Sequence, residues 1–342
     1  MKSPFFSICV PAHNASKAIK NLLSNLSKQS FQNWELVIVD DASNDTLGEY
    51  ISQQKFIPAK KIKYLFLREN HGPYYARKVA FASSTGLYVI CIDADDTLIG
   101  EKALSILYKC ITKHPVDILF FNATRNLISL DRYIDYCGSG LHNGYLHPSK
   151  VQDLFLSTSL FNNLWAKVIK RSVLHPVSFD KADGLKMCED RLEMAGAILK
   201  SASFFLLDTC LYYYKNQVGS TTNSLYNYDY CKQQVFVESA IYKLYSKKER
   251  NWDKFYSQFL EIWADDVKCI ARNRRALDLV RIYQIMSEDS FFKTAFSNAK
   301  IRGYRLDHKI SLFFLRHHLV YFLVLWSKFL QFCISCKERF TS

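Results

Sequence analysis

Over its first 120 residues, the chain alternates between short apolar runs and stretches with helical periodicity. The apolar runs are rich in Val, Ile, Phe and Tyr, which is typical of strands buried on both faces. These runs are Phe6–Val10, Leu36–Val39, Ile62–Leu67, Tyr88–Ile92 and Ile118–Phe121. The helical stretches carry apolar residues at Ala18, Leu22, Leu23 and Leu26, then Tyr75, Val79 and Ala82, then Leu104, Leu107 and Ile111. Strand–helix–strand alternation predicts an α/β fold with a parallel, doubly wound sheet and right-handed crossovers.

Ligands bind such sheets at the carboxyl ends of the strands, so the residues after each run are candidates for a site. PAHN follows the first run, where we expect Pro11 to end the strand and Asn14 to cap the next helix. DDASND follows the second run, at residues 40–45. Its carboxylates can accept hydrogen bonds from a base or a ribose, but Ser43 and Asn44 can equally cap a helix. Both interpretations of DDASND stay open.

Three carboxylates crowd the end of the fourth run, in Asp93-Ala94-Asp95-Asp96. Carboxylates repel one another at the mouth of a parallel sheet, and a divalent cation would relieve that repulsion. Mg²⁺ or Mn²⁺ prefers such hard oxygen ligands together with phosphate oxygens. Alternation along an extended segment places Asp93 and Asp95 on one side, and we expect Asp96 to cap the next helix. A solvated acidic turn is the alternative.

A second acidic pair, Glu189-Asp190, opens the helical stretch Arg191–Leu199. Acids stabilise a helix N-terminus, so capping is one interpretation. A general base that deprotonates an acceptor hydroxyl is the other. The chain has no G-x-x-x-x-G-K-[ST] loop and no G-x-G-x-x-G after a strand, which argues against a P-loop NTPase and an NAD enzyme.

Taken in order, seven motifs resemble those of glycosyltransferase family 2, which has the GT-A fold. The resemblance covers residues 5 to about 222 and rests on FSICVPAHN, ELVIVDDASND, HGPYYARKVA, YVICIDADDTL, NNLWAKVIKRSVL, CEDRLEMAGAIL and YYYKNQVGSTT. It implies an inverting transfer from a nucleotide-sugar, which we expect to be a UDP-sugar. The expected acceptor is a saccharide or lipid-linked oligosaccharide of cell-surface polysaccharide biosynthesis.

The resemblance also implies roles for single residues in donor binding. Pro11 and Ala12 would line the base and ribose, Asp41 would accept from the base, and Arg77 would lie over the nucleotide. Asp93 would lie near the ribose.

For the metal and the reaction, the resemblance implies that Asp95 holds a divalent cation, Mn²⁺ or Mg²⁺, as the last acid of a DxD motif. Asp190 would be the base, with Glu189 beside it. Trp165 and Lys167 would contact the acceptor and phosphates, and Lys215 would begin a segment, to Thr221, that closes over the diphosphate. Three departures from the family pattern put donor identity in doubt: Ala76-Arg77-Lys78 for Ala-Arg-Asn, Ala80 for Gly, and Tyr214-Lys215 for Tyr-Arg.

We expect residues 1–225 to form the transferase domain, with a nucleotide-sugar half at 1–122 and an acceptor half at 123–225. Residues 226–342 are expected to form a basic helical region. Within it, the apolar stretch Leu312–Cys336 is interrupted by Arg316, two histidines and Lys328, and its uninterrupted part is too short to span a bilayer. It is either a core helix or an interfacial helix at the inner leaflet.

The net charge of +13 fits a nucleic acid or an anionic membrane face. The basic residues of the last hundred lie beside aromatic ones, which favours the membrane, and no nucleic-acid-binding motif is present. Ten cysteines without a pairing pattern predict reduced thiols and a cytoplasmic chain, with peripheral membrane association left open. The competing functions are a sugar nucleotidyltransferase and a non-catalytic nucleotide-sugar-binding or scaffold protein of the same fold.

Overall fold

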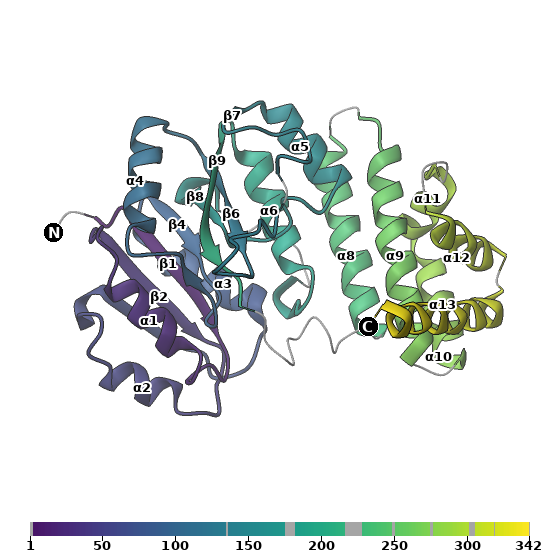
Figure 1. The fold of residues 1–342 in the computed structure, drawn as a ribbon, viewed down its shortest axis with the longest axis horizontal. Coiled ribbons are helices and arrows are strands. Elements are labelled where there is room, and N and C mark those ends of the chain that lie inside the picture. The colour runs from purple at the N-terminus through teal and green to yellow at the C-terminus, as the bar shows by residue number, and fades with distance from the viewer. Residues whose placement is uncertain are drawn as a thin grey trace. The chain divides into compact units, whose positions relative to one another are not determined.

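The computed structural model describes residues 3–134, 136–174, 182–215, 228–247, 250–273, 276–300, 305–317 and 319–341. The chain divides into two compact units (Figure 1). One comprises Met1–Phe155 and Ser159–Val218, and the other comprises Leu156–Thr158 and Gly219–Ser342.

The first unit is built on one sheet, in which the described residues form nine strands. They are β1 (Phe6–Ala12), β2 (Trp34–Asp40), β3 (Ile62–Phe66), β4 (Tyr88–Cys91), β5 (Thr97–Leu98), β6 (Ile118–Thr124), β7 (Gly144–Leu146), β8 (Lys167–Lys170) and β9 (Phe204–Tyr213). The strand order is β3-β2-β1-β4-β8-β6-β9-β5, with β7 paired to β9. The α/β fold class is confirmed.

The sheet is parallel among its first strands and mixed among its later ones. β1 pairs in parallel with β2 and β4, and β2 with β3, as the alternation predicts. The later strands make the sheet mixed, because β8 runs antiparallel to β4 and β6, and β9 runs antiparallel to β5 and β7. All residues of β2 and β6 are buried, since helices cover both faces of a doubly wound sheet.

Helices flank this sheet in the first unit, and a helical array makes up the second. The first set is α1 (Ile19–Ser27), α2 (Leu47–Gln53), α3 (Pro73–Ser83), α4 (Ala103–Lys113), α5 (Pro148–Ser157) and α6 (Glu189–Lys200), with 3₁₀ turns at Ala59–Lys61, Arg171–Val173 and Ala182–Gly184. The second set is α8 (Tyr228–Tyr245), α9 (Asp253–Asn273), α10 (Ala276–Glu288), α11 (Ser290–Asn298), α12 (Leu306–Arg316) and α13 (Val320–Thr341). The described helices include none long and apolar enough to cross a membrane.

Two predicted helix and strand ends are wrong. Pro11 lies inside β1, paired with Val39, because its ring tolerates extended backbone. Asn14 does not cap α1, whose N-cap is Ala18. Its side chain instead accepts from the Asn44 N–H, and its own N–H donates to the Ser43 hydroxyl, which ties the two loops together.

The buried face of α3 also differs from the expected one. The helix begins as the sequence favours, with Pro73 in its first turn after Gly72. Its buried residues, however, are Tyr74, Ala76, Arg77, Ala80 and Phe81, whereas Ala82 is exposed. Because the buried face of α3 includes an arginine, hydrophobic periodicity alone predicted the wrong face of this helix.

Candidate active site

The parallel register brings the loops after β1, β2 and β4 to one edge of the sheet. Ala12 lies opposite Asp40, and the Asp41 N–H donates to the Ala12 carbonyl at 2.8 Å. Cys9 lies opposite Cys91, and the Ile92 N–H donates to the Cys9 carbonyl at 3.1 Å. PAHN, DDASND and DADD therefore share this edge, as the rule for parallel sheets predicts.

Asp41 is buried and anchors the loop that precedes α3. Its two carboxylate oxygens accept from the N–H groups of His71, at 2.8 Å, and Gly72, at 2.7 Å. Gly72 has φ of +88°, and a Cβ there would lie 2.9 Å from the Leu185 carbonyl oxygen. Only glycine fits this position, so Asp41 already holds a backbone turn beside Pro11 and Ala12.

Arg77 is the centre of the site. Its guanidinium, almost fully buried, lies 3.0 Å from a Glu189 oxygen, 2.5 Å from Asp190 Oδ1 and 3.4 Å from Asp93 Oδ1. Asp93 follows β4, whereas the acidic pair opens α6, about one hundred residues further along the chain. Arg77 thus joins the two acidic motifs, which the sequence presented separately.

The carboxyl groups around Arg77 sit in a low-dielectric setting. Burial raises the pKa of Asp93 to about 6, with Arg77 opposing that rise. Burial and the neighbouring Asp190 raise the pKa of Glu189, again against Arg77. One turn further along α6, burial raises the pKa of Glu193 well above its usual range, and its Oε2 finds no hydrogen-bond partner among the described residues. The site therefore holds more carboxyl groups than one arginine can neutralise.

Asp95 and Asp96 take different roles. Asp96 is buried and does not cap a helix, since it accepts from the Tyr212 hydroxyl at 2.7 Å and from the Lys215 N–H at 2.8 Å. Burial raises the pKa of Asp96 to about 8. Burial also raises the pKa of Asp95, and Lys215 lowers it. Asp96 fastens the end of β9, which leaves Asp95 as the acid of this motif facing Lys215.

Trp165 and Lys167 flank a strained residue, Ala166, whose φ is +54°. Lys167 is fully buried, and its ammonium donates to the carbonyls of Asn163 and Trp165. Burial lowers the pKa of Lys167 to about 7. The contact of Lys167 with phosphates stays a prediction; in the structure its ammonium supports the loop that carries Trp165.

An aromatic group extends from the acidic motif towards solvent. The Trp165 ring stacks on Tyr212, with centroids 5.3 Å apart, and packs against Tyr133 and Tyr214. The Arg125 guanidinium lies 4.0 Å from the Tyr133 ring centroid. Sequence reasoning gave no role to Tyr212, Tyr133 or Arg125. Their proximity depends on the pairing of β6 with β9 and on the Tyr133 N–H, which donates to the Ala123 carbonyl.

Backbone strain is concentrated around the site. Ala42, Ala166 and Cys188 have φ of +56°, +54° and +60°, in the left-handed region that non-glycine residues rarely adopt. They adjoin Asp41, Lys167 and Glu189 respectively. Such strain persists where surrounding contacts fix the backbone, and it is typical of functional sites. Of the proposed closing segment, Lys215 is described and exposed, and residues 216–221 lie outside the described residues.

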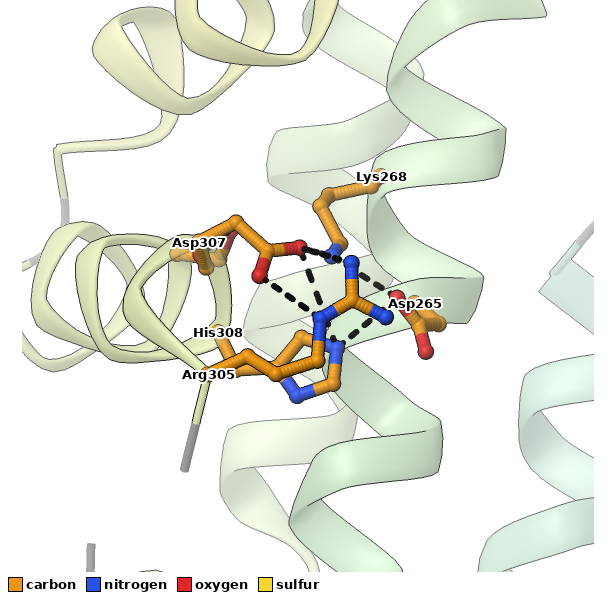
Figure 2. Close-up of polar contacts among 6 residues, drawn as sticks. Asp265, Lys268, Arg305, Asp307 and His308 are labelled. Carbon is orange, nitrogen blue, oxygen red and sulfur yellow. Dashed lines mark hydrogen bonds and ion pairs between the residues drawn. The ribbon is translucent and has the colours of Figure 1, made fainter. Parts of the chain in front are cut away.

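A second acidic cluster lies in the helical unit. Figure 2 shows it between α9 and α12. Asp265, Asp307 and His308 place ligand atoms within 4.8 Å of one another. The Lys268 ammonium, however, lies 2.7 Å from Asp265 and 2.6 Å from Asp307. An ammonium already occupies the position that a metal would take, so the cluster is a salt-bridge network and not a metal centre.

Comparisons with known proteins identify relatives of this chain. The model of the family "Glycosyl transferase family 2" matches residues 7–161. Glycosyltransferase GlyG of Streptococcus pneumoniae is 23% identical over 243 residues, which cover 69% of this chain and 79% of GlyG. Poly(ribitol-phosphate) beta-N-acetylglucosaminyltransferase TarS of Staphylococcus aureus is 27% identical over 213 residues, which cover 61% of this chain but only 35% of TarS.

The fold is also found in solved structures. Residues 1–349 of S. aureus TarS superpose with a TM-score of 0.67 at 17% identity, covering 94% of this chain and 90% of that one. The same fragment in complex with UDP-GlcNAc gives a TM-score of 0.64 at 19% identity. At these identities the likeness shows the fold, and the sequence matches supply the family. The match over residues 7–161 and the named relatives identify this part of the chain as a glycosyltransferase family 2 domain and the protein as a glycosyltransferase.

Proposed function

We propose that this protein is an inverting transferase that moves a sugar from a nucleotide-sugar, most simply a UDP-sugar, to a saccharide or lipid-linked acceptor in cell-surface polysaccharide biosynthesis. The names of its relatives support this proposal. TarS is named for transfer of N-acetylglucosamine to poly(ribitol-phosphate), and its fragment has been solved with UDP-GlcNAc. The donor sugar, nucleotide and acceptor of this chain are part of the proposal.

One observation carries the proposal above a non-catalytic role. Asp93, at the donor edge of the sheet, and the Glu189-Asp190 pair meet on the Arg77 guanidinium. Burying this many acids around one arginine costs stability, and a merely structural role would be served as well by apolar residues. Acids kept in such a place are typical of sites that bind phosphate-linked metal ions and move protons.

Asp190 is the proposed base. Arg77 holds one of its oxygens, and the Leu164 N–H donates to the other at 3.1 Å. These two contacts fix the direction of the carboxylate, which would take the acceptor hydroxyl proton as that oxygen attacks C1 of the sugar. Glu189 is the second candidate, because it shares the same guanidinium nitrogen.

Asp95 is the proposed ligand of a divalent cation, Mn²⁺ or Mg²⁺. The donor set fits, since Asp93 and Asp95 offer hard oxygens and burial raises the pKa of both carboxyls. When bound, the cation would act as a Lewis acid towards the leaving diphosphate. The exposed Lys215 side chain would add positive charge on the same side.

We assign the remaining residues supporting roles. Pro11, Ala12 and Asp41 would form the wall against the base and ribose, and Trp165 would face the acceptor. Arg77 is buried beneath the carboxylates, so we assign it to positioning Asp93 and Asp190 rather than to contact with the nucleotide. Lys167 would position Trp165 through its two carbonyl contacts.

Asp190→Asn tests the base. The amide keeps size and can still accept from Leu164, but it cannot take a proton. We expect transfer to fall roughly 10²–10⁴-fold while the donor still raises the melting temperature. Transfer should also be lost in EDTA, and Asp95→Asn should behave like EDTA.

The donor for this assay comes from a screen of UDP-, GDP- and dTDP-sugars for thermal stabilisation with Mn²⁺. Glu189→Gln is the matched control. If Glu189→Gln abolishes transfer and Asp190→Asn leaves it within about tenfold of normal, the base assignment is wrong. If no sugar nucleotide stabilises the protein, the catalytic proposal itself fails.

We further propose that the enzyme works in the cytoplasm at the inner face of the membrane, held there peripherally. A lipid-linked acceptor would be presented at that surface, and the basic, aromatic C-terminal region is suited to it.

A further inference from the structure

α13 carries several large apolar side chains on the side that faces away from its own helical unit. Five of them are more than half exposed: Tyr321 at 60%, Phe322 at 56%, Leu325 at 66%, Phe329 at 55% and Phe332 at 67%. At 3.6 residues per turn, they fall within an arc of about 100° around the helix axis. This is a continuous apolar stripe, whereas single exposed apolar residues would be unremarkable.

The opposite side of α13 is fixed against its neighbours. Leu323, Val324 and Ser327 are buried, and Trp326 and Leu330 line a cavity beside the Asp265–Lys268–Asp307 network. The helix therefore cannot turn its stripe inward without breaking its own packing. Part of the stretch Leu312–Cys336 therefore packs in the core of the helical unit, which was one of the two alternatives from the sequence. Another part lies on the surface.

Basic side chains accompany the stripe. Lys328 is exposed and lies about 20° outside this arc, next to Tyr321 around the helix axis. On α12, which precedes α13, Lys309 and Arg316 are exposed on either side of Phe313, itself 53% exposed. From residue 305 to the end, the chain has six Lys and Arg against two Asp and Glu.

We propose that this stripe is the surface by which the protein lies on an anionic lipid bilayer, with α13 parallel to the membrane plane. Phe, Tyr and Leu would enter the boundary between headgroups and acyl chains, and Lys328, Lys309 and Arg316 would meet lipid phosphates. The charge favours lipid over a second copy of the chain. In a two-fold dimer, the same basic stripe would face itself and the like charges would oppose contact.

The inference names the surface for the membrane location proposed above, but it stands on exposure and charge and needs no knowledge of the donor or acceptor. Binding to vesicles can therefore be measured on the full chain without any sugar nucleotide. Failure of transfer and failure of membrane binding are then separate results.

The experiment is co-sedimentation of the full chain with phosphatidylcholine vesicles that contain or lack phosphatidylglycerol. We expect binding that requires phosphatidylglycerol and weakens as salt is raised. Leu325→Asp should weaken vesicle binding roughly tenfold or more, because a charge replaces an apolar side chain that would be buried in the bilayer. Lys328→Gln should weaken it about fivefold.

Matched changes in the other unit provide the controls. Phe56 is 49% exposed and Lys113 is exposed, so Phe56→Asp and Lys113→Gln alter similar surface away from the stripe. Both should bind vesicles like the unchanged protein. Leu325→Asp should keep the melting temperature, since position 325 does not pack inward.

The absence of vesicle binding by the unchanged chain would overturn the proposal, and so would any of three other results. The first is equal loss of vesicle binding in Phe56→Asp and Leu325→Asp. The second is a large fall in melting temperature for Leu325→Asp, which would mean that the stripe is packed within the molecule. The third is a dimer, seen by light scattering, that Leu325→Asp converts to a monomer without any effect of lipid.

Discussion

At the scale of single residues, buried charge explains most of what is unusual in this protein. Arg77 replaces the expected apolar residue on the inner face of α3 and collects three carboxylates. Lys167 is buried against two backbone carbonyls, and Asp96 against a tyrosine hydroxyl and a backbone N–H. Each group is tolerated because hydrogen bonds or opposite charge offset its desolvation.

Asp266 in α9 gives a prediction about pH. Burial raises its pKa to about 7, whereas its ordinary value is 3.8. The folded state therefore holds a proton that the unfolded state releases, and this contribution to stability is lost as pH rises from about 4 to about 7. Asp266→Asn should remove that loss and make the protein more stable above pH 7 by roughly 1–3 kcal/mol.

Urea unfolding at pH 5.5 and pH 8 measures the effect. The control is Asp229→Asn, at an exposed position near the start of α8, which should leave the pH dependence unchanged. If Asp266→Asn shifts stability equally at both pH values, the buried proton is not its cause.

At the scale of elements, the geometry of the candidate site depends on how α6 begins. Cys188, the residue before the helix, has φ of +60°, and from there Glu189 and Asp190 enter the first turn. The left-handed residue turns the chain so that both acids point at Arg77. A helix with an ordinary N-cap would aim its first turn elsewhere, because backbone direction sets side-chain direction.

Substitution of Cys188 tests this dependence. Glycine adopts positive φ without strain, so Cys188→Gly should keep transfer within about threefold of normal. Cys188→Val places a β-branched residue in the left-handed region, which costs about 1–2 kcal/mol or a shift of the helix start. We expect the valine variant to lose much of its kcat and to keep donor binding. Equal activity of the two variants would show that the turn is not what directs Asp190.

At the scale of the whole molecule, the proposed catalytic residues and the proposed membrane-binding surface lie in different units. Every residue proposed for donor, metal and base lies in the first unit, and the salt-bridge network and the α13 stripe lie in the second. In our proposals, the sheet supplies rigid strand ends for the chemistry and the helical unit supplies a membrane-binding surface.

A chain ending at residue 227 should therefore keep the donor site. We expect the same UDP-sugar to raise the melting temperature of the shortened and full chains by similar amounts, because the ligand contacts only the first unit. The shortened chain should not bind anionic vesicles. Circular dichroism would show whether the shortened chain is folded. If it is folded and the UDP-sugar does not raise its melting temperature, this division between the units is wrong.

The sequence by itself determined the early parallel strands, the helices between them and the meeting of the loops after β1, β2 and β4. Periodicity and strand-end chemistry are local properties, and the parallel rule converts them into a shared edge. Only the tertiary structure decided that Arg77 faces inward across 112 residues to Glu189, that Lys167 is buried, and that the stripe of α13 faces outward. Which face of a helix is covered depends on what packs against it. An apolar face has the same sequence pattern whether it packs into a protein core or contacts a membrane.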